Sequence, residues 1–439
     1  MKIIVKQTLI GIKHRINANP KLKIKIMSIL NRFPMLKARL KRIHYHQVSH
    51  TSLISNRTSR ELLVDITHVY SDDLKTGIQR VVRSILNELE NNDAIENIDV
   101  QPIFLTDRNG YWHYRYVKDT DTIVIPKVKD IFLGLDLNAG VTEAAFAGLF
   151  DDWKLRGVQI NFVVYDILPI LHPYWWQDGI GLAHEAWLKT LLHYSDQIIC
   201  ISKSVSNDVR EYLIQHTADI HNQPAVNWFH LGADIDSSLP SKGISEDAQY
   251  VLNRLKSEPS FLSVGTIEPR KGYKQTLNAF EKLWLDGMNI NFVIVGKQGW
   301  MVDELAAKIR NHPELNKRLF WLEGISDEYL EKVYAASICL IAASEGEGFG
   351  LPLIEAAQKE LSIIARDILV FREVAGEYAY YFKNNHDTEA LADTIAGWLA
   401  LYKGNNQTKS DKMPWMTWEQ STHKLVDIIT KNKIRSEKK

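Results

Sequence analysis

From Glu61 onwards, short apolar runs alternate with segments whose apolar residues recur at helical spacing. The runs are rich in Ile, Val and Phe, and few polar residues interrupt them, which is typical of strands buried on both faces of a parallel sheet. This alternation predicts α/β domains with helices covering parallel sheets. We expect strands over residues 62–66, 100–104, 122–125, 131–135, 160–165, 197–201, 226–231, 261–264, 292–295, 319–322, 338–342, 362–365 and 379–382.

These strands are too many for one sheet of six or seven strands, so the pattern predicts two doubly wound domains. The break falls where residues 237–260 become charged and rich in Ser, Pro and Gly. We expect an N-terminal domain over 61–236, a linker over 237–258 and a C-terminal domain over 259–410. A last helix after Pro414 and a frayed tail fill residues 411–439. The two domains are expected to face each other across a cleft that holds ligands at the strand ends.

Composition narrows the possible classes of protein. The 439 residues are 45% hydrophobic, and 53 basic residues balance 53 acidic ones, which argues against a nucleic-acid binder and against a disordered chain. The two cysteines, Cys200 and Cys339, both lie in apolar runs. This usage excludes a disulfide scaffold, a cysteine-rich zinc site and an iron–sulfur cluster, and it fits the reducing cytoplasm.

The balanced total hides a strongly basic N-terminal arm. Residues 1–60 hold 14 Lys and Arg and no acid, which leaves 39 basic against 53 acidic residues in the rest of the chain. Ile26, Ile29, Leu30 and Phe33 recur at helical spacing among the basic residues, which favours a helix lying on an anionic membrane surface. The alternative is a poorly ordered basic tail without function. No apolar run is long enough to span a membrane, and no signal peptide is recognisable.

The stretch ASEGEGFGLPLIEAAQ, residues 343–358, carries the clearest candidate chemistry. It follows a predicted buried strand and leads into a helix that begins near Leu351. Its glycines let a ligand approach the backbone, and amides at a helix N-terminus attract anions. Glu347 in the loop and Glu355 in the helix can bracket a polyhydroxylated ligand. The alternative is an ordinary Gly-rich turn with exposed acids.

A second candidate site lies at the end of an earlier strand, in FLSVGTIEPRKG, residues 261–272. The strand ends at Gly265, and Arg270 and Lys271 precede a helix. An adjacent guanidinium and ammonium at this position suit a diphosphate, although a solvated basic helix start is the alternative. The next strand ends at Gly296 and Lys297 in the same way.

Together, VGTIEPRKG and EGEGFGLPLIEA resemble family 4 of the retaining, nucleotide-sugar-dependent glycosyltransferases, which have the GT-B fold of two Rossmann-like domains. The spacing of Glu347 and Glu355 is that family's paired-glutamate motif. The resemblance covers residues 61–430 and leaves the basic arm unmatched. It implies transfer of a sugar from a nucleotide diphosphate sugar. We expect no cofactor and no metal, because Arg270, Lys271 and a helix dipole can replace the charge of a metal ion.

The resemblance also implies roles for individual residues. Arg270 and Lys271 would hold the donor diphosphate, Glu347 would face the donor sugar and Glu355 would bind the ribose hydroxyls. The other donor-binding residues that we expect lie at strand ends, in the first-domain loop KTGIQRV, in the base-binding stretch and in the glycine loop. They are Gly77, Gly265, Gly296, Lys297, Ile325, Gly348, Phe349, Gly350 and Leu351.

One position departs from the family pattern. Relatives often carry His-Asp where this chain has Tyr165 and Asp166. A phenol is not a base near neutral pH, so we expect Asp166 to bind the sugar or the acceptor, and His172 is a possible local substitute for the histidine. Two Asp-x-Asp sequences, residues 119–121 and 234–236, follow no long buried strand, and we interpret them as turns and not as metal ligands.

We therefore expect a retaining, metal-independent hexosyltransferase that acts in lipopolysaccharide or other surface polysaccharide synthesis. The expected donor is GDP-mannose, and the expected acceptor is a hydroxyl of a growing, lipid-linked glycan. Its partners would be the nucleotide sugar, this glycan and an anionic membrane surface, with no nucleic acid, and it would lie peripherally at the cytoplasmic face of the cell membrane. The alternatives are a non-catalytic subunit that binds sugar nucleotides and a GT-B-like sugar-nucleotide epimerase.

Overall fold

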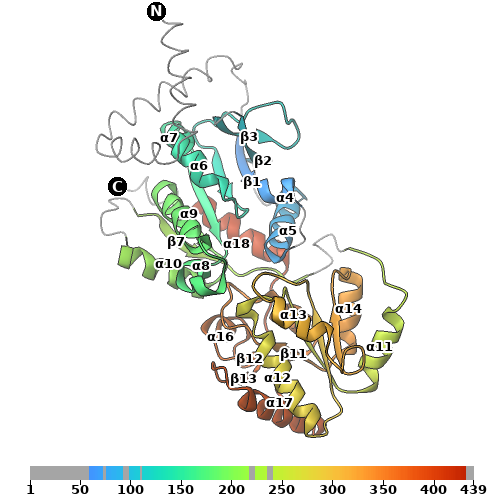
Figure 1. Cartoon of the computed structure of the whole chain (residues 1–439). Coiled ribbons are helices and arrows are strands. Elements are labelled where there is room, and N and C mark those ends of the chain that lie inside the picture. The colour runs from blue at the N-terminus through green and yellow to red at the C-terminus, as the bar shows by residue number, and fades with distance from the viewer. Residues whose placement is uncertain are drawn as a thin grey trace, which may run out of the picture.

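A computed structural model describes residues 59–72, 76–91, 98–108, 111–216, 223–234 and 241–431 of the chain. These residues form two α/β domains, each with a central sheet and helices on both faces (Figure 1). The basic arm lies outside the described residues apart from its last two positions, so its membrane-surface helix stays a prediction. None of the helices in the described ranges is long and apolar enough to cross a membrane.

The first domain is built on a seven-stranded sheet in the order β3-β2-β1-β4-β5-β6-β7. All neighbouring strands are parallel except β2 and β3, which form an antiparallel hairpin at one edge. The strands are β1 (Arg60–Asp65), β2 (Ile98–Arg108), β3 (Tyr111–Tyr116), β4 (Ile131–Gly134), β5 (Gln159–Val164), β6 (Gln197–Cys200) and β7 (Ala225–Trp228).

Two sequence predictions for this sheet were wrong. Residues 122–125 form no strand but only an isolated bridge between Ile123 and Arg115, because Asp119 accepts hydrogen bonds from Thr122 that hold a turn. The strand β3 was missed because its sequence, YWHYRY, lacks aliphatic residues. Aromatic residues also favour strands, and the preceding Asn-Gly dipeptide is a common hairpin signal.

The second domain is built on a six-stranded parallel sheet in the order β10-β9-β8-β11-β12-β13. All six strands overlap the predicted runs, because each is a largely apolar segment, and β9 and β12 are buried along their whole length. The strands are β8 (Ser260–Val264), β9 (Asn291–Val295), β10 (Leu319–Leu322), β11 (Cys339–Ala342), β12 (Ser362–Arg366) and β13 (Tyr380–Phe382).

The helices connect the strands and cover the sheets. Those between the strands of the first domain are α4 (Thr67–Ser71), α5 (Gly77–Asn91), α6 (Gly140–Ala147), α7 (Leu149–Leu155), α8 (Leu168–Leu171), η1 (Pro173–Trp175), α9 (Ile180–Tyr194) and α10 (Lys203–His216). Later in the chain come α11 (Ala248–Ser257), η3 (Pro269–Lys271), α12 (Tyr273–Leu285), α13 (Asp303–Arg310), α14 (Asp327–Ala336), α15 (Leu351–Gln358), α16 (Leu369–Ala375), α17 (Thr388–Lys403) and α18 (Trp418–Lys431).

Two helices lie near the predicted domain boundaries. Residues 248–257 of the predicted linker form the helix α11, which buries Val251, Leu252 and Leu255 and packs against α14 of the second domain. The last helix, α18, returns to the first domain and packs against α5, so residues 77–91 and 418–431 share one core (Figure 1). Gln159 of β5 donates a hydrogen bond to the carbonyl of Ile429 in α18 over 2.8 Å.

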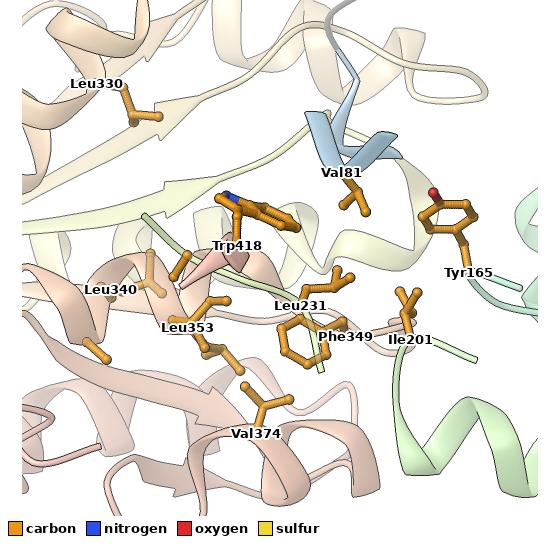
Figure 2. Close-up of a cluster of buried hydrophobic side chains, with 14 of the residues drawn as sticks. Val81, Tyr165, Ile201, Leu231, Leu330, Leu340, Phe349, Leu353, Val374 and Trp418 are labelled. Carbon is orange, nitrogen blue, oxygen red and sulfur yellow. The ribbon is translucent and has the colours of Figure 1, made fainter. Parts of the chain in front are cut away.

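One apolar core is continuous across the two domains. It includes Leu62 and Val64 of the first sheet and Leu262 and Leu340 of the second. Figure 2 shows Phe349 of the second domain beside Leu231 and Ile201 of the first. Because Phe349 is only 3% exposed, the glycine loop of the second domain is held against the first domain by apolar burial.

Candidate active site

The two sequence motifs follow adjacent strands of the second sheet. β8 lies between β9 and β11, so the connections that leave β8 and β11 diverge at this point. Open α/β sheets bind ligands at such a switch point, outside the carboxyl ends of the strands. The loop after β8 carries Arg270 and Lys271 in η3, and the loop after β11 carries residues 343–350. The fold therefore brings together two motifs that are distant in sequence.

Arg270, Lys271 and Glu347 form an ion cluster that we call the clamp. Lys271 Nζ donates to Glu347 Oε1 over 2.5 Å, and Arg270 Nη1 donates to Glu347 Oε2 over 2.9 Å. Arg270 Nη1 also donates to the carbonyl of Gly346 over 2.8 Å. The three side chains are only 13–15% exposed. Two cations thus converge on one carboxylate at the switch point.

Charge fixes the protonation states in the clamp. Burial alone would raise the pKa of Glu347, but Lys271 and Arg270 lower that pKa from 4.5 to about 2. Glu347 is therefore ionised at neutral pH and can accept hydrogen bonds but has no proton to donate. Burial also disfavours the charged form of Arg270, yet Glu347 and Glu268 outweigh it and raise the pKa of the guanidinium.

Glu268 is a buried carboxylate beside the clamp that the sequence analysis did not single out. It is 7% exposed, and its Oε2 lies 3.0 Å from Arg270 Nε. Neither atom makes a hydrogen bond, although both are buried. Burial raises the pKa of Glu268 against the opposing effect of Arg270 and Lys271. The position of Glu268 directly before the Pro-Arg-Lys sequence is the signal from which it could have been predicted.

The glycines of the second motif are required by close contacts with the first domain. A Cβ on Gly348 would lie 2.1 Å from the carbonyl oxygen of Tyr165, and one on Gly346 would lie 2.9 Å from the ring of Trp175. The Gly348 carbonyl accepts a hydrogen bond from Ser202 Oγ over 2.7 Å. Gly350 precedes α15 with a φ of 99°, which favours glycine. The loop therefore fits the ends of β5 and β6.

The strand-end glycines of the second domain also pack closely. A Cβ on Gly296 would lie 2.0 Å from the carbonyl oxygen of Gly265, so the close approach of the two backbones leaves no room for a side chain at this position. The same carbonyl accepts a hydrogen bond from Tyr273 Oη over 2.6 Å. Lys297 is exposed and contributes its backbone carbonyl to the amide of Ile267. Lys271 reaches this strand end, since its Nζ lies 3.6 Å from the position that a Cβ on Gly265 would take.

The predicted nucleoside residues lie around α15 and the start of α14. Glu355 is buried in α15, where its Oε2 accepts a hydrogen bond from Tyr334 Oη over 2.8 Å. Its Oε1 accepts one from Nη1 of Arg80 over 2.5 Å, a contact with α5 of the first domain that sequence reasoning missed. Ile325 packs, partly buried, against the shared core before α14, and Leu351 is the first residue of α15.

The first domain contributes Gly77, Tyr165 and Asp166. Gly77 begins α5 with open space around it, since a Cβ there would meet no atom within 4 Å. Tyr165 is buried and donates to the carbonyl of Leu135 over 2.8 Å. Burial, and then Asp136, raise the pKa of Tyr165 well above 10, so it is a structural phenol and not a base. Asp166 Oδ1 accepts from the amide of Leu168 over 3.0 Å.

Within the described part of the chain, His172 makes no hydrogen bond to a residue of the clamp, so its contacts give it no role as a base. Its ring stacks obliquely on Trp175 with the centroids 4.3 Å apart. Burial lowers the pKa of His172 below 6.5, although Glu345 opposes this. Of the two Asp-x-Asp sequences, Asp119 holds a turn and Asp234 accepts a hydrogen bond from the amide of Trp418. Among the described residues, no group of three His, Cys, Asp or Glu side chains could hold a metal ion.

Structure comparison identifies the architecture as the GT-B fold. The structure of sucrose-phosphate synthase from Thermosynechococcus elongatus superposes with a TM-score of 0.59 and 16% identity, covering 86% of this chain and 100% of that one. Anabaena HepE in complex with UDP and glucose gives a TM-score of 0.54 at 13% identity, with coverages of 86% and 98%. At such low identities these matches establish the fold alone.

Sequence comparison identifies the second domain. Residues 245–412 match the model of the family "Glycosyl transferases group 1", so they form a glycosyl transferases group 1 domain. The chain is 44% identical over 380 residues to the serotype-specific mannosyltransferase WbdA of Escherichia coli, covering 84% of this chain and 46% of WbdA. It is 27% identical over 177 residues to the E. coli O-antigen chain mannosyltransferase B, covering 38% and 44%. The chain spans less than half the length of these relatives.

Proposed function

We propose that this chain is a retaining glycosyltransferase that moves a sugar from a nucleotide diphosphate sugar to a hydroxyl of a surface glycan. The observation that carries the proposal is the clamp, where Arg270 and Lys271 converge on Glu347 at the switch point of the second sheet. The two cations suit a diphosphate, and an ionised carboxylate suits sugar hydroxyls. The glycosyl transferases group 1 domain spans all three residues.

The proposed reaction needs no protein nucleophile. The bond between the sugar's anomeric carbon and the diphosphate oxygen breaks, and the acceptor oxygen bonds to the same face of that carbon. The acceptor proton passes to the departing phosphate oxygen. Arg270 and Lys271 neutralise the charge that grows on this phosphate. This electrostatic interaction is stronger in the transition state than in the bound substrate, and it therefore lowers the barrier. Asp166, at the opposing strand end, positions a hydroxyl of the sugar or acceptor.

We expect the donor to be GDP-mannose and the acceptor to be a lipid-linked glycan. The relatives named mannosyltransferases support the sugar, and those named for the O-antigen support a surface glycan. A thermal-shift screen of GDP, UDP and dTDP against the whole chain tests the nucleotide, because a ligand that binds the folded state raises its stability, and at equal concentration the tighter ligand raises it more. The GDP-mannose assignment predicts the largest shift with GDP, and a larger shift with UDP or dTDP would overturn it.

A transfer assay with the matching sugar nucleotides separates the proposed reaction from its alternatives. Glycosyl transfer to a mannose-containing acceptor, with the donor's anomeric configuration in the NMR spectrum of the product, supports a retaining transferase. Donor isomerisation without transfer would indicate an epimerase, and binding without turnover would indicate a non-catalytic subunit. We expect activity to persist in EDTA, since Arg270 and Lys271 supply the positive charge; loss of activity restored by a divalent cation would contradict metal independence.

The basic arm is proposed to hold the enzyme at the cytoplasmic face of the membrane, where a lipid-linked acceptor would lie. Its 14 positive charges attract anionic lipid, and salt screens this attraction. The full chain should co-sediment with vesicles containing anionic lipid at low salt, and a chain lacking residues 1–58 should not. Activity of the shortened chain on a soluble acceptor should remain. Equal sedimentation of the two chains would refute the arm's role.

A further inference from the structure

A second charged cluster crosses the interface between the two domains. Arg80, one turn into α5 of the first domain, pairs through Nη2 with Asp327 Oδ1 and through Nη1 with Glu355 Oε1, the latter over 2.5 Å. Asp327 begins α14 and Glu355 lies in α15, both in the second domain. We call these three residues the bridge.

The two carboxylates of the bridge are held in place by their own domain. Glu355 Oε2 accepts from Tyr334 Oη over 2.8 Å. Asp327 Oδ2 accepts from the amide and the hydroxyl of Ser241 over 2.8 and 2.7 Å. The acids therefore form a prepared acceptor surface, and Arg80 is the one member of the bridge that the first domain contributes.

Arg80 covers this acceptor surface. The side chain of Glu355 is only 5% exposed, whereas those of Arg80 and Asp327 are 23% and 24% exposed. A ligand that approaches the Glu355 carboxylate must therefore displace the guanidinium that lies over it. Burial disfavours the charge on Arg80, but Glu355 and Asp327 outweigh it and raise the pKa of the guanidinium, so Arg80 stays charged.

The bridge coincides with the stretch assigned above to the nucleoside. The family resemblance implies that Glu355 binds the ribose hydroxyls and that Ile325 lies in the base-binding stretch, and Asp327 follows Ile325 by two residues. We propose that Arg80 competes with the nucleoside for Glu355 and so closes the nucleoside site until a donor displaces it. This inference rests on the proposed function, and it makes Arg80 a residue that sets nucleotide affinity and links donor binding to the first domain.

The competition has a measurable consequence for affinity. If the bridge is closed for most of the time, the apparent dissociation constant of a nucleoside diphosphate is the intrinsic one divided by the open fraction. Arg80→Met keeps the apolar stem but removes the charge, so it should tighten binding of the diphosphate selected in the thermal-shift screen by about fivefold or more. Arg80→Lys keeps one point charge but cannot pair with both acids as a fork, so its affinity should lie between those of wild type and Arg80→Met.

Titration calorimetry on the full chain tests this directly. Arg156→Met is the matched control, because Arg156 pairs with Asp152 in the first domain over 2.7 Å and involves no residue of the second; its affinity should equal that of wild type. Should Arg80→Met fail to fold, Arg80→Lys gives the same test with a smaller expected change. Unchanged or weaker binding in the folded Arg80 variants would overturn the proposal, and weaker binding would make Arg80 a donor ligand.

A second measurement follows the release of the bridge itself. Hydrogen exchange of the amides at the start of α5 should become faster when the diphosphate is added to wild type, because Arg80 loses its partners. In Arg80→Met the exchange should be insensitive to the ligand. Slower exchange in wild type would contradict release. If wild type bound no nucleoside diphosphate at all, the proposed function would fail; if it bound one and only the Arg80 predictions failed, the competition alone would be wrong.

Discussion

The clamp and the bridge are both partly buried groups of ion pairs at the domain interface, but they differ in how the chain assembles them. All three residues of the clamp come from two neighbouring loops of one sheet. The bridge joins two acids of the second domain to an arginine of the first. The clamp is therefore formed whenever the second domain is folded, whereas the bridge also needs the first domain in its present position.

This difference assigns the two groups to different steps of the proposed reaction. A cluster that is fixed within one domain can stabilise developing charge without rearrangement, which is what electrostatic catalysis requires. A cluster that spans two domains responds to their relative position and suits control of binding. Variants of the clamp should therefore change turnover, and variants of the bridge should change affinity.

The largest effect is expected from removing a cation of the clamp. Arg270→Ala or Lys271→Ala should lower kcat by at least about tenfold and up to about 10³-fold, because each removes a charge that acts on the leaving phosphate. Steady-state kinetics with saturating donor measures this. Lys282→Ala is the control, since Lys282 pairs with Asp286 on the exposed face of α12. Unchanged kcat in both clamp variants would remove the basis for the donor-site assignment.

The next effect concerns Glu355 and should appear in affinity, not in kcat. Glu355→Gln keeps the side-chain volume but replaces a charged acceptor, so nucleoside diphosphate binding should weaken by about 1.5–3 kcal/mol in the Arg80→Met background. In wild type the loss should be smaller, because the same substitution also frees the site from Arg80. Calorimetry on the four proteins of this double-mutant cycle provides the comparison. Equal losses of binding free energy in both backgrounds would show that Arg80 does not compete for Glu355, and would contradict the proposal.

Acid should weaken the clamp in a defined pH window. The pKa of Glu347 is lowered from 4.5 to about 2 in the folded protein. A lowered pKa means that the ionised form stabilises the fold above pH 4.5, and that this contribution is lost as the pH falls from 4.5 towards 2; it is of the order of 3 kcal/mol. Urea unfolding of wild type and Glu347→Gln at pH 6.5 and pH 3.5 measures it. The difference between the two proteins should shrink at the lower pH, and a constant difference would show that Glu347 does not titrate with the fold.

The smallest effect is expected at Tyr165, on the first-domain side of the interface. Tyr165→Phe removes the hydroxyl that donates to the carbonyl of Leu135, which should cost about 1 kcal/mol of stability. Turnover should stay within about twofold, because a buried neutral phenol takes no part in proton transfer. Thermal unfolding and kinetics measure the two quantities. A loss of kcat as large as that of the clamp variants would move the chemistry towards the first domain.

Much of the fold could be predicted from the sequence, because buried parallel strands are continuous apolar runs. All six strands of the second sheet overlap the predicted segments, and the helix expected to begin near Leu351 is α15. The errors occurred where local pattern and tertiary context conflict. Residues 122–125 look like a strand but follow a turn held by Asp119, and α11 looked like a linker because its exposed face is polar.

The sequence by itself determined which residues are candidates for the chemistry, since the spacing of Glu347 and Glu355 and the adjacent Arg270 and Lys271 depend only on residue order. It also placed them at strand ends, because strand–helix alternation leads to one topology in which those ends share an edge. Only the tertiary structure decided how the charges pair. The packing of the loops and of the two sheets decides which acid pairs with Arg270. It also brings Arg80 to Glu355, which lies 275 positions away in the chain. Ion pairs between sheets leave no periodic signal in the sequence.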